Sequence, residues 1–326
     1  MMASLVVTFD AEARLRALVE AAVADQAQVI WLADLDAPAR AEALRGAGAV
    51  MARHTNELKP DERKLLTSAR LLQMTTAGVD YIPFGDLPPG LPIAQNAGPF
   101  SDAIAEHAVA MALAAAKRLF IEHNNLKNGA FNQFTRNRML AGGVCGIFGF
   151  GAIGVATARR MRALGMRVHA INRRGASDEP VDWIGTPDRL DELLTVSDVL
   201  VIGAALTRAT LGAIGARELA LMKTDAILVN LARGEIIDEA AFYAHLVAHK
   251  GFTACIDAWW TEPLRHGVFR LDHPFLDLPN VIGSPHNSAM VPGLYDEVLR
   301  HAVANCLVAL AGGAPARLVR PEERLA

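Results

Sequence analysis

Three glycines at turn spacing form the first pattern in this chain that indicates chemistry. Gly149, Gly151 and Gly154 follow an apolar run at residues 144–150, and residues 155–164 have helical periodicity. The first glycine can adopt the positive φ that a tight turn needs. The second lets the backbone approach a pyrophosphate, and the third lets the helix pack closely on the strand.

The start of the expected helix would complete this anion site. Its first amides, which include those of Ala152 and Ile153, have no partner within the helix and can face a phosphate. A second apolar run, residues 168–171, follows at the distance typical of a βαβ unit. In this context the glycines predict dinucleotide binding. The alternative is a glycine-rich turn in an unrelated α/β domain.

The residues after this second run indicate which dinucleotide binds. NAD sites usually carry a carboxylate here for the ribose hydroxyls, whereas Asn172, Arg173 and Arg174 occupy the position in this chain. Guanidinium groups can clamp the 2′-phosphate of NADP in a bidentate manner. We therefore expect NADP(H), with NAD as the other cofactor left open. The alternative interpretation is two solvated surface arginines.

Polar side chains of catalytic type follow three other apolar runs of strand length. They are Arg233, Glu262 and His286, and Leu231 and Ala232 precede the arginine. The ends of parallel strands lie along one edge of a sheet, the edge that also carries the glycine turn. We therefore expect all five residues near a bound nicotinamide cofactor.

The elements that position these residues alternate between strands and helices, which favours parallel sheets covered by helices. In the first hundred residues we expect strands at 5–9, 28–32, 49–52 and 71–75, and helices at 11–24, 37–45 and near 61–67. Beyond residue 174 we expect helices at 188–194, 216–222 and 238–248, and strands at 198–204, 226–231, 253–256 and 280–283. Ala77, Gly78 and Val79 follow the fourth strand, where successive backbone amides can bind a carboxylate.

A domain boundary is expected near residue 100. Residues 86–99 are rich in proline and glycine and resemble a connection, and a long helix begins at Ser101. Residues 125–142 are polar and read as irregular. A final long helix over residues 292–311 would carry the chain back to the first domain. The prediction is two doubly wound α/β domains, a flavodoxin-like one at 1–99 plus 290–326 and a Rossmann one at 100–289.

Composition excludes several other classes of protein. The 326 residues are 52% hydrophobic and 21% charged, with a net charge of −3 and no basic stripe, which argues against a nucleic-acid partner. The three cysteines lie far apart without metal-ligand spacing, so we expect reduced core thiols and no metal. No signal peptide and no membrane span are indicated, and we expect a cytoplasmic protein.

Six motifs along the chain resemble those of the D-isomer-specific 2-hydroxyacid dehydrogenase family, which includes glyoxylate and hydroxypyruvate reductases. They are TTAGVD at 75–80, NAGPFSDAIAEHAVAMALA at 96–114, GFGAIG at 149–154, NLARGEIIDEAAF at 230–242, DAWWTEP at 257–263 and SPHNSA at 284–289. They occur in the family's order over nearly the whole length. The resemblance implies that the first domain binds substrate and the second binds the dinucleotide.

The resemblance also implies roles for single residues. Arg233 matches the arginine that binds the substrate carboxylate, Glu262 the partner of the catalytic histidine, and His286 the acid/base. Ala77, Gly78 and Val79 match the backbone stretch that holds the substrate carboxylate. Asp257 matches the aspartate that orients the nicotinamide carboxamide. The family chemistry is hydride transfer to a 2-keto acid, with His286 supplying the proton.

Three alternative functions stay open at this point. A phosphoglycerate dehydrogenase would usually bring more basic residues and often a further domain. A formate dehydrogenase would be expected to carry glutamine at the position of Glu262. A dinucleotide-sensing corepressor on the same scaffold belongs to a different class, since fold alone does not define function.

Other features bear on the surroundings of the expected site. Ala205 stands where many relatives have proline, and residues 264–278 form a longer segment than expected, in which His266 and His273 are expected at the surface. Trp259 and Trp260 are expected either at the domain interface or in the wall of a pocket. The resemblance implies a homodimer, with the helix from Ser101 and residues 125–140 as candidate contacts.

Overall fold

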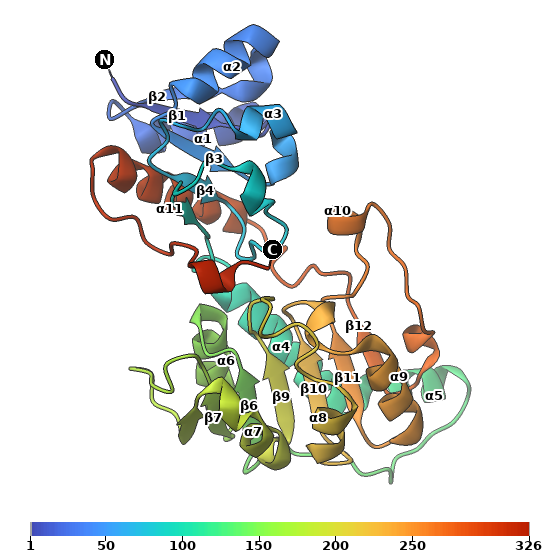
Figure 1. Cartoon of the computed structure of the whole chain (residues 1–326). Coiled ribbons are helices and arrows are strands. Elements are labelled where there is room, and N and C mark those ends of the chain that lie inside the picture. The colour runs from blue at the N-terminus through green and yellow to red at the C-terminus, as the bar shows by residue number, and fades with distance from the viewer. Residues whose placement is uncertain (1, 326) are drawn as a thin grey trace. The chain divides into compact units, whose positions relative to one another are not determined.

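The computed structural model describes residues 2–325, which form two compact α/β units (Figure 1). The first unit runs up to Phe100 and resumes at Val291, and the second comprises Ser101–Met290. Each unit has its own parallel sheet, as the alternation of strands and helices predicts. No helix of residues 2–325 is long and apolar enough to cross a membrane.

The first unit contains a five-stranded sheet in the order β2-β1-β3-β4-β5, and all its pairs are parallel. The strands are β1 (Ser4–Val7), β2 (Gln28–Trp31), β3 (Ala49–Ala52), β4 (Leu72–Met74) and β5 (Ile93–Ala94). The helices are α1 (Ala13–Val23), α2 (Ala37–Arg45), α3 (Pro60–Arg63) and α11 (Leu294–Leu310). Helix α11 packs against α1 and β3, so the end of the chain completes this unit.

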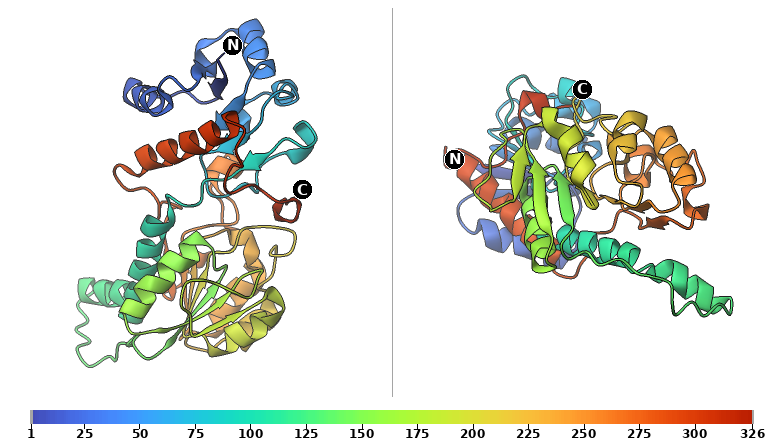
Figure 2. Two further views of the ribbon diagram at one scale, coloured as in Figure 1. Left: turned by 90° about the vertical axis from the view of Figure 1, so that its left-hand side faces the viewer. Right: turned by 90° about the horizontal axis from the view of Figure 1, so that it is seen from below.

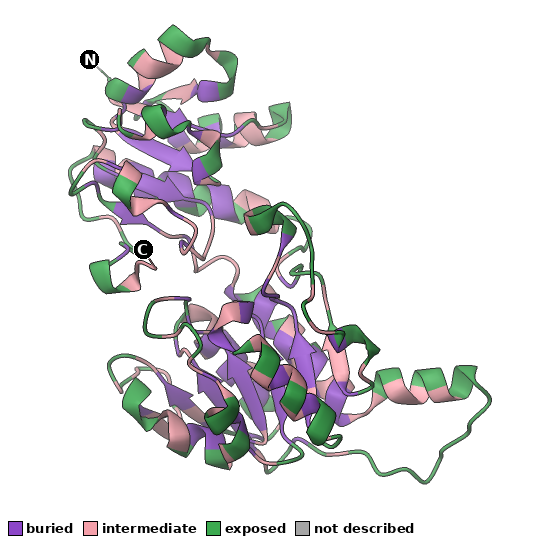
Figure 3. Cartoon of the chain, turned by 45° about the vertical axis from the view of Figure 1, so that its right-hand side comes forward, coloured by how far each residue is buried: buried purple, intermediate pink, exposed green. Residues whose placement is uncertain are grey.

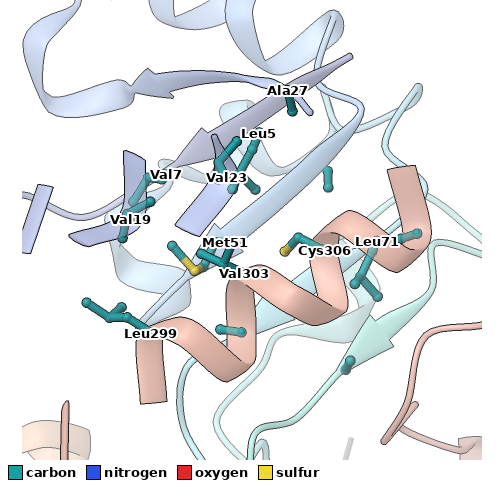
Figure 4. Close-up of a cluster of buried hydrophobic side chains, with 14 of the residues drawn as sticks. Leu5, Val7, Val19, Val23, Ala27, Met51, Leu71, Leu299, Val303 and Cys306 are labelled. Carbon is teal, nitrogen blue, oxygen red and sulfur yellow. The ribbon is translucent and has the colours of Figure 1, made fainter. Parts of the chain in front are cut away.

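Two apolar cores lie on opposite faces of the five-stranded sheet. Alternate residues of a strand point to opposite faces, so Val7 and Met51 enter one core while Val6 and Val50 enter the other. Figure 4 shows the first of these cores, where Leu299, Val303 and Cys306 of α11 lie beside side chains of β1 and β3. Burial of this apolar face is what holds the returning helix in place.

The second unit contains a seven-stranded parallel sheet in the order β12-β11-β10-β9-β6-β7-β8. Its strands are β6 (Val144–Phe148), β7 (Arg167–Ile171), β8 (Trp183–Gly185), β9 (Val199–Ile202), β10 (Ile227–Asn230), β11 (Thr253–Ile256) and β12 (Val281–Gly283). Its helices are α4 (Ser101–Ala116), α5 (Leu119–Lys127), α6 (Ala152–Ala163), α7 (Leu190–Val196), α8 (Ala216–Leu221), α9 (Glu239–Ala248) and α10 (Pro263–His266). Helices α4 and α6 pack side by side (Figure 2), and α8 packs against both α7 and α9.

The strand order of this second sheet reverses at β6. The chain moves from β6 outward to β7 and β8, and then returns to β9 on the other side of β6. The carboxyl ends of β6 and β9 therefore flank a topological switch point, where open α/β sheets bind ligands. The glycine turn comes directly after β6.

Several expected elements differ from the structure. The helix expected near residues 61–67 is limited to α3, the four residues Pro60–Arg63. The proline-rich stretch 86–99 is more than a connection, because β5 within it pairs with β4. The polar stretch from residue 125 was expected to be irregular, yet α5 continues to Lys127. Strand β8 was not expected, since only three residues pair with β7.

Helix α5 was hard to recognise because it lacks an apolar face that enters a core. None of its residues is buried, and Leu119, Phe120 and Leu126 are each 56% exposed (Figure 3). Sequence periodicity detects helices that bury one side against their own domain. An exposed helix does not produce this pattern.

Candidate active site

The turn after β6 has the geometry that its glycines predict. Gly149 has φ 105°, and a Cβ at this position would lie 2.2 Å from the backbone nitrogen of Ala204, just after β9. A Cβ at Gly154 would lie 2.6 Å from the carbonyl oxygen of Gly149. Both glycines are therefore required for close packing at the switch point.

Gly151 differs from the other two glycines because nothing lies within 4 Å of the position of its Cβ. It is the N-cap of α6 and supplies no side-chain hydrogen bond to the first turn. The first-turn amides, including those of Ala152 and Ile153, have no capping side chain to bind. Open space beside a helix N-terminus fits the pyrophosphate of a dinucleotide.

The three residues after β7 form a turn with exposed arginines. Asn172 accepts a hydrogen bond from the backbone nitrogen of Arg174 at 2.9 Å, and its amide donates to the carbonyl of Ala176 at 2.9 Å. Arg173 and Arg174 are exposed. Asn172 therefore shapes the turn, while the two guanidinium groups are accessible from solvent.

Arg233 follows β10 in a turn that is held by hydrogen bonds from Asn230 and by close packing of Gly234 against Trp259. The buried side chain of Asn230 donates to the carbonyl of Arg233 at 2.9 Å and accepts from the nitrogen of Ala232 at 3.1 Å. A Cβ at Gly234 would lie 2.5 Å from the backbone of Trp259, so glycine is required there. The turn after β10 consequently packs against the segment after β11, which carries Glu262.

Glu262 and His286 are in close hydrogen-bonding contact. Nδ1 of His286 lies 2.9 Å from Oε1 and 2.8 Å from Oε2 of the carboxylate. Burial alone would raise the pKa of Glu262, but the hydrogen bond from His286, the Trp259 amide and the charge of Arg233 together hold that pKa below its ordinary value. The pair therefore keeps an ionised carboxylate against the imidazole ring, and the charge of Arg233 lies close by.

The backbone of His286 adopts a conformation that few residues adopt. Its φ is 52°, in the left-handed region where histidine, asparagine and aspartate are enriched among non-glycine residues. Such a conformation costs on the order of 1–3 kcal/mol and persists only where the surroundings hold it. The side chain is 37% exposed, so the ring is accessible while its Nδ1 is engaged.

Asp257 provides the anchor for this strained loop. Its carboxylate is fully buried and accepts from the Ser284 hydroxyl at 2.5 Å, the Asn287 amide at 3.2 Å and the Ser288 amide at 3.4 Å. His107 of α4 lies with Nε2 3.0 Å from the same serine hydroxyl. The donors flank His286 on both sides. Sequence reasoning did not foresee His107 or Ser284, because no spacing rule links α4 to the loop after β12.

The tryptophan pair packs within the second unit. Trp260 is 9% exposed, donates to the carbonyl of Ile237 at 2.8 Å and stacks on Phe275 at 5.1 Å between ring centroids. Trp259 is 3% exposed and donates to the carbonyl of Ser284 at 2.8 Å. Trp259 thereby adds a second support for the loop of His286.

The two histidines of the long segment also have structural partners. His266 is exposed, and its Nδ1 accepts a hydrogen bond from the backbone nitrogen of Glu262 at 3.0 Å. His273 is half-buried and stacks on Tyr243 at 4.9 Å between ring centroids. The segment that carries both histidines begins with the short helix α10 and ends with a 3₁₀ turn at Phe275–Asp277.

Ala77, Gly78 and Val79 lie in the first unit, in the loop directly after β4. The Thr76 hydroxyl donates to the carbonyl of Gly78 at 3.0 Å, which fixes the loop's course. Val79 is buried, whereas Ala77 and Gly78 are half-buried. The loop thus presents backbone at the carboxyl edge of its sheet, the edge where such sheets bind ligands.

The fold and these two sheet edges define a dinucleotide-binding α/β protein, and the comparisons with known proteins give its family. Residues 109–288 match the family model described as D-isomer specific 2-hydroxyacid dehydrogenase, NAD binding domain. The chain belongs to this family of NAD(P)-dependent oxidoreductases. The family resemblance noted in the sequence is thereby confirmed.

Individual relatives carry different names. A glyoxylate/hydroxypyruvate reductase B of Pectobacterium atrosepticum is 31% identical over 89% of this chain and 88% of its own length. A D-3-phosphoglycerate dehydrogenase of Archaeoglobus fulgidus is 30% identical over 82% of this chain, and the match spans half of that enzyme's length. The crystal structure of a putative formate dehydrogenase from Pyrobaculum aerophilum has a TM-score of 0.82 at 24% identity, covering 98% of this chain and 99% of its own, which confirms the fold.

Proposed function

We propose that the protein reduces small 2-keto acids, glyoxylate and hydroxypyruvate first among them, to 2-hydroxy acids, of the D configuration where the product is chiral. The observation that carries this proposal is the close contact between His286 Nδ1 and the Glu262 carboxylate, at 2.8 Å, at the same sheet edge as the glycine turn. The glyoxylate/hydroxypyruvate reductase matched over most of both chains supports this substrate class. A bound dihydronicotinamide would supply the hydride.

The residues of this chain would then handle the proton and the charge. With Nδ1 engaged by Glu262, His286 presents Nε2 to the substrate and delivers a proton to the oxygen on which negative charge grows. Glu262 accepts the Nδ1 hydrogen bond and fixes the orientation of the ring. Arg233, whose planar fork suits a carboxylate, binds the acid group and polarises the carbonyl.

The cofactor would lie along the carboxyl edge of the seven-stranded sheet. The residues proposed to hold it are Gly149, Gly151, Ala152, Ile153, Gly154, Leu231, Ala232 and Asp257. The open space at Gly151 fits the pyrophosphate. Asp257 is already bonded to the loop of His286, so its contact with the nicotinamide would be made by an anchored carboxylate.

We propose NADPH as the preferred cofactor. Asn172 shapes the turn after β7, and its neutral side chain would not repel a 2′-phosphate as a carboxylate would. The exposed Arg173 and Arg174 supply positive charge at this turn. NADH is the alternative.

The first unit would bind the substrate carboxylate through the backbone of Ala77, Gly78 and Val79. This assigns substrate binding to residues 1–99 with 290–326, and dinucleotide binding to residues 100–289. Successive amides in a loop at a strand end form an anion site of the kind a carboxylate requires. No nucleic acid is expected as a partner.

We further propose a homodimer in the cytoplasm. Exposed apolar side chains gather on α5 and the following loop, including Phe120, Phe131 and Phe134 at 56%, 75% and 88% exposure. Exposed apolar groups in such number are typical of a surface that another chain covers. The three cysteines are free and buried, which suits a reducing compartment.

The proposal is tested by a panel of 2-keto acids assayed with NADPH and NADH side by side. We expect turnover of glyoxylate and hydroxypyruvate, with a higher kcat/KM for NADPH than for NADH. No turnover of any 2-keto acid would refute the enzymatic proposal and favour a dinucleotide-sensing binding protein. Preferred turnover of 3-phosphohydroxypyruvate would assign the chain to the phosphoglycerate dehydrogenases instead, the name of its archaeal relative.

A further inference from the structure

A second group of polar side chains lies at the carboxyl edge of the five-stranded sheet, beside the loop after β4. Arg53 follows β3, Thr75 follows β4, and Tyr295 lies in the first turn of α11. Glu57 comes from the short 3₁₀ turn after Arg53. The proposed catalytic chemistry uses none of these four side chains.

Tyr295 and Thr75 are the least satisfied members of this group. Both side-chain hydroxyls are buried and have no hydrogen-bond partner within residues 2–325. Burial raises the pKa of Tyr295, and the neighbouring Arg53 and Thr75 offset part of that rise, so the hydroxyl stays a neutral donor. Buried polar groups without a partner are uncommon and costly in native proteins. A ligand oxygen placed against this hydroxyl would remove the cost.

Hydrogen bonds tie this group to the loop of residues 77–79. The Thr76 hydroxyl donates to the Gly78 carbonyl at 3.0 Å and lies 2.5 Å from the Tyr81 hydroxyl. The Tyr81 hydroxyl, which can donate its single proton to Thr76, lies 3.2 Å from the carbonyl of Arg53. A molecule whose carboxylate lies on the loop therefore has the Arg53 segment as its neighbour in the same unit.

The charge of Arg53 is already balanced. Its Nε lies 3.2 Å from Oε1 of Glu57, and its backbone nitrogen donates to Oε2 at 3.1 Å. The carboxylate of Glu57 is 14% exposed and also accepts from the Thr8 hydroxyl at 2.5 Å, so it is held firmly in place. A phosphate would have to lie against this carboxylate, whereas a hydroxyl could accept from Tyr295 or Arg53 and donate to Glu57.

We infer that Arg53, Glu57 and Tyr295 form a subsite for a neutral, hydroxyl-bearing substituent on the keto carbon. This inference rests on the proposed function and narrows it. Hydroxypyruvate, which carries a hydroxymethyl group, is then preferred over glyoxylate, which carries only hydrogen, and over 3-phosphohydroxypyruvate. Arg53, Glu57 and Tyr295 are specificity-determining residues and take no part in proton or hydride transfer.

The test compares kcat/KM for hydroxypyruvate, glyoxylate and 3-phosphohydroxypyruvate in the full-length protein and two variants. Tyr295→Phe removes one neutral hydrogen bond, so the ratio of hydroxypyruvate to glyoxylate kcat/KM is expected to fall about fivefold. Glu57→Gln removes the countercharge of Arg53, so the ratio of phosphorylated to unphosphorylated substrate is expected to rise about tenfold. Tyr243→Phe, in the other unit, is the matched control and keeps both ratios.

The outcomes separate the subsite from the proposed function. Wild-type protein that reduces glyoxylate but shows no preference for hydroxypyruvate, or ratios that do not move in Tyr295→Phe, would overturn the subsite alone. Wild-type preference for 3-phosphohydroxypyruvate would overturn it as well. Absence of turnover with glyoxylate and hydroxypyruvate alike would overturn both. Unfolding temperatures of the variants, measured alongside, exclude misfolding as the cause of a changed ratio, because misfolding lowers all rates together.

Discussion

Glu262 presents both carboxylate oxygens to Nδ1 of His286, at 2.9 and 2.8 Å. Oε1 also accepts from the backbone nitrogen of Trp259 at 2.7 Å, so the carboxylate cannot rotate freely. This arrangement orients the ring, places a proton on Nδ1 and leaves Nε2 for the substrate.

Removal of the proposed acid or the proposed carboxylate ligand should abolish most turnover. We expect His286→Asn and Arg233→Ala to lower kcat/KM for glyoxylate by on the order of a hundredfold or more. Asparagine tolerates the left-handed backbone of His286, so this substitution tests the ring rather than the strain. His273→Ala is the control, since that ring stacks on Tyr243. Near wild-type turnover in either site variant would contradict the assignment.

The lowered pKa of Glu262 also predicts a pH dependence of stability. The folded-state pKa of Glu262 is lowered, so its ionised form stabilises the fold above the unfolded-state pKa, near the ordinary 4.5. That contribution is lost as the pH falls through the lower, folded-state pKa. Thermal unfolding of wild type and Glu262→Gln from pH 7 to pH 3 measures it. We expect the stability advantage of wild type to shrink below about pH 4.5; a constant difference over this range would refute the coupling.

The two arginines after β7 predict cofactor preference. We expect Arg173→Ser combined with Arg174→Ser to raise KM for NADPH about tenfold or more, while KM for NADH changes little, because only NADPH carries the 2′-phosphate. Arg167→Ser is the control, since Arg167 is an exposed arginine at the opposite end of the same strand. Initial-rate kinetics with NADPH and with NADH measure both KM values in each variant. Equal effects on NADPH and NADH would show that the arginines do not contact the phosphate.

Alanine substitutions of the turn glycines should affect different properties, folding at Gly149 and cofactor binding at Gly151. Gly149→Ala introduces a Cβ 2.2 Å from the Ala204 backbone at φ 105°, so we expect loss of folded protein or a large drop in unfolding temperature. Gly151→Ala points its methyl group into open space, so we expect a stable protein with about tenfold weaker NADPH binding by fluorescence titration. Unchanged NADPH affinity in Gly151→Ala would place the pyrophosphate elsewhere.

The exposed aromatic side chains on the loop after α5 predict self-association. Phe134→Glu with Phe131→Glu should shift the protein from dimer to monomer in analytical ultracentrifugation, because buried charges oppose association. Leu264→Glu changes a residue that is 71% exposed elsewhere in the same unit and should leave the mass unchanged. A wild-type chain that sediments as a monomer at micromolar concentration would refute the dimer.

Much of the fold could be predicted from local sequence. The bounds of α2, β3 and β11 agree with those expected, because Asp36 caps α2 and the two strands are mostly buried apolar runs. The stretches that were wrong have weak local patterns. Strands β5 and β8 are two and three residues long and exist only because a neighbouring strand pairs with them. Helix α5 has no buried face.

The residues proposed for the site were also named from sequence, and the family resemblance implied that Glu262 partners His286, but residue spacing did not. Spacing alone gave no reason for Glu262 to meet His286 rather than His266 or His273, which lie nearer in the chain. The parallel register of β11 with β12 decided this, since it places the segments after Ile256 and Gly283 side by side. The same register brings Ser284 and the Asn287 amide to Asp257.

The sequence by itself determined the glycine turn, the strand ends that carry Arg233, Glu262 and His286, and the family. These features depend on residue type and short-range spacing, so they can be recognised within short stretches of the sequence. The tertiary structure alone decided the anchoring of the strained His286 loop by Asp257, and the meeting of Tyr295 with Arg53 from opposite ends of the chain. The packing of α11 against the first sheet brings Tyr295 close to Arg53. This packing is stabilised by burial of apolar side chains from segments far apart in the sequence, so no short stretch of sequence predicts it.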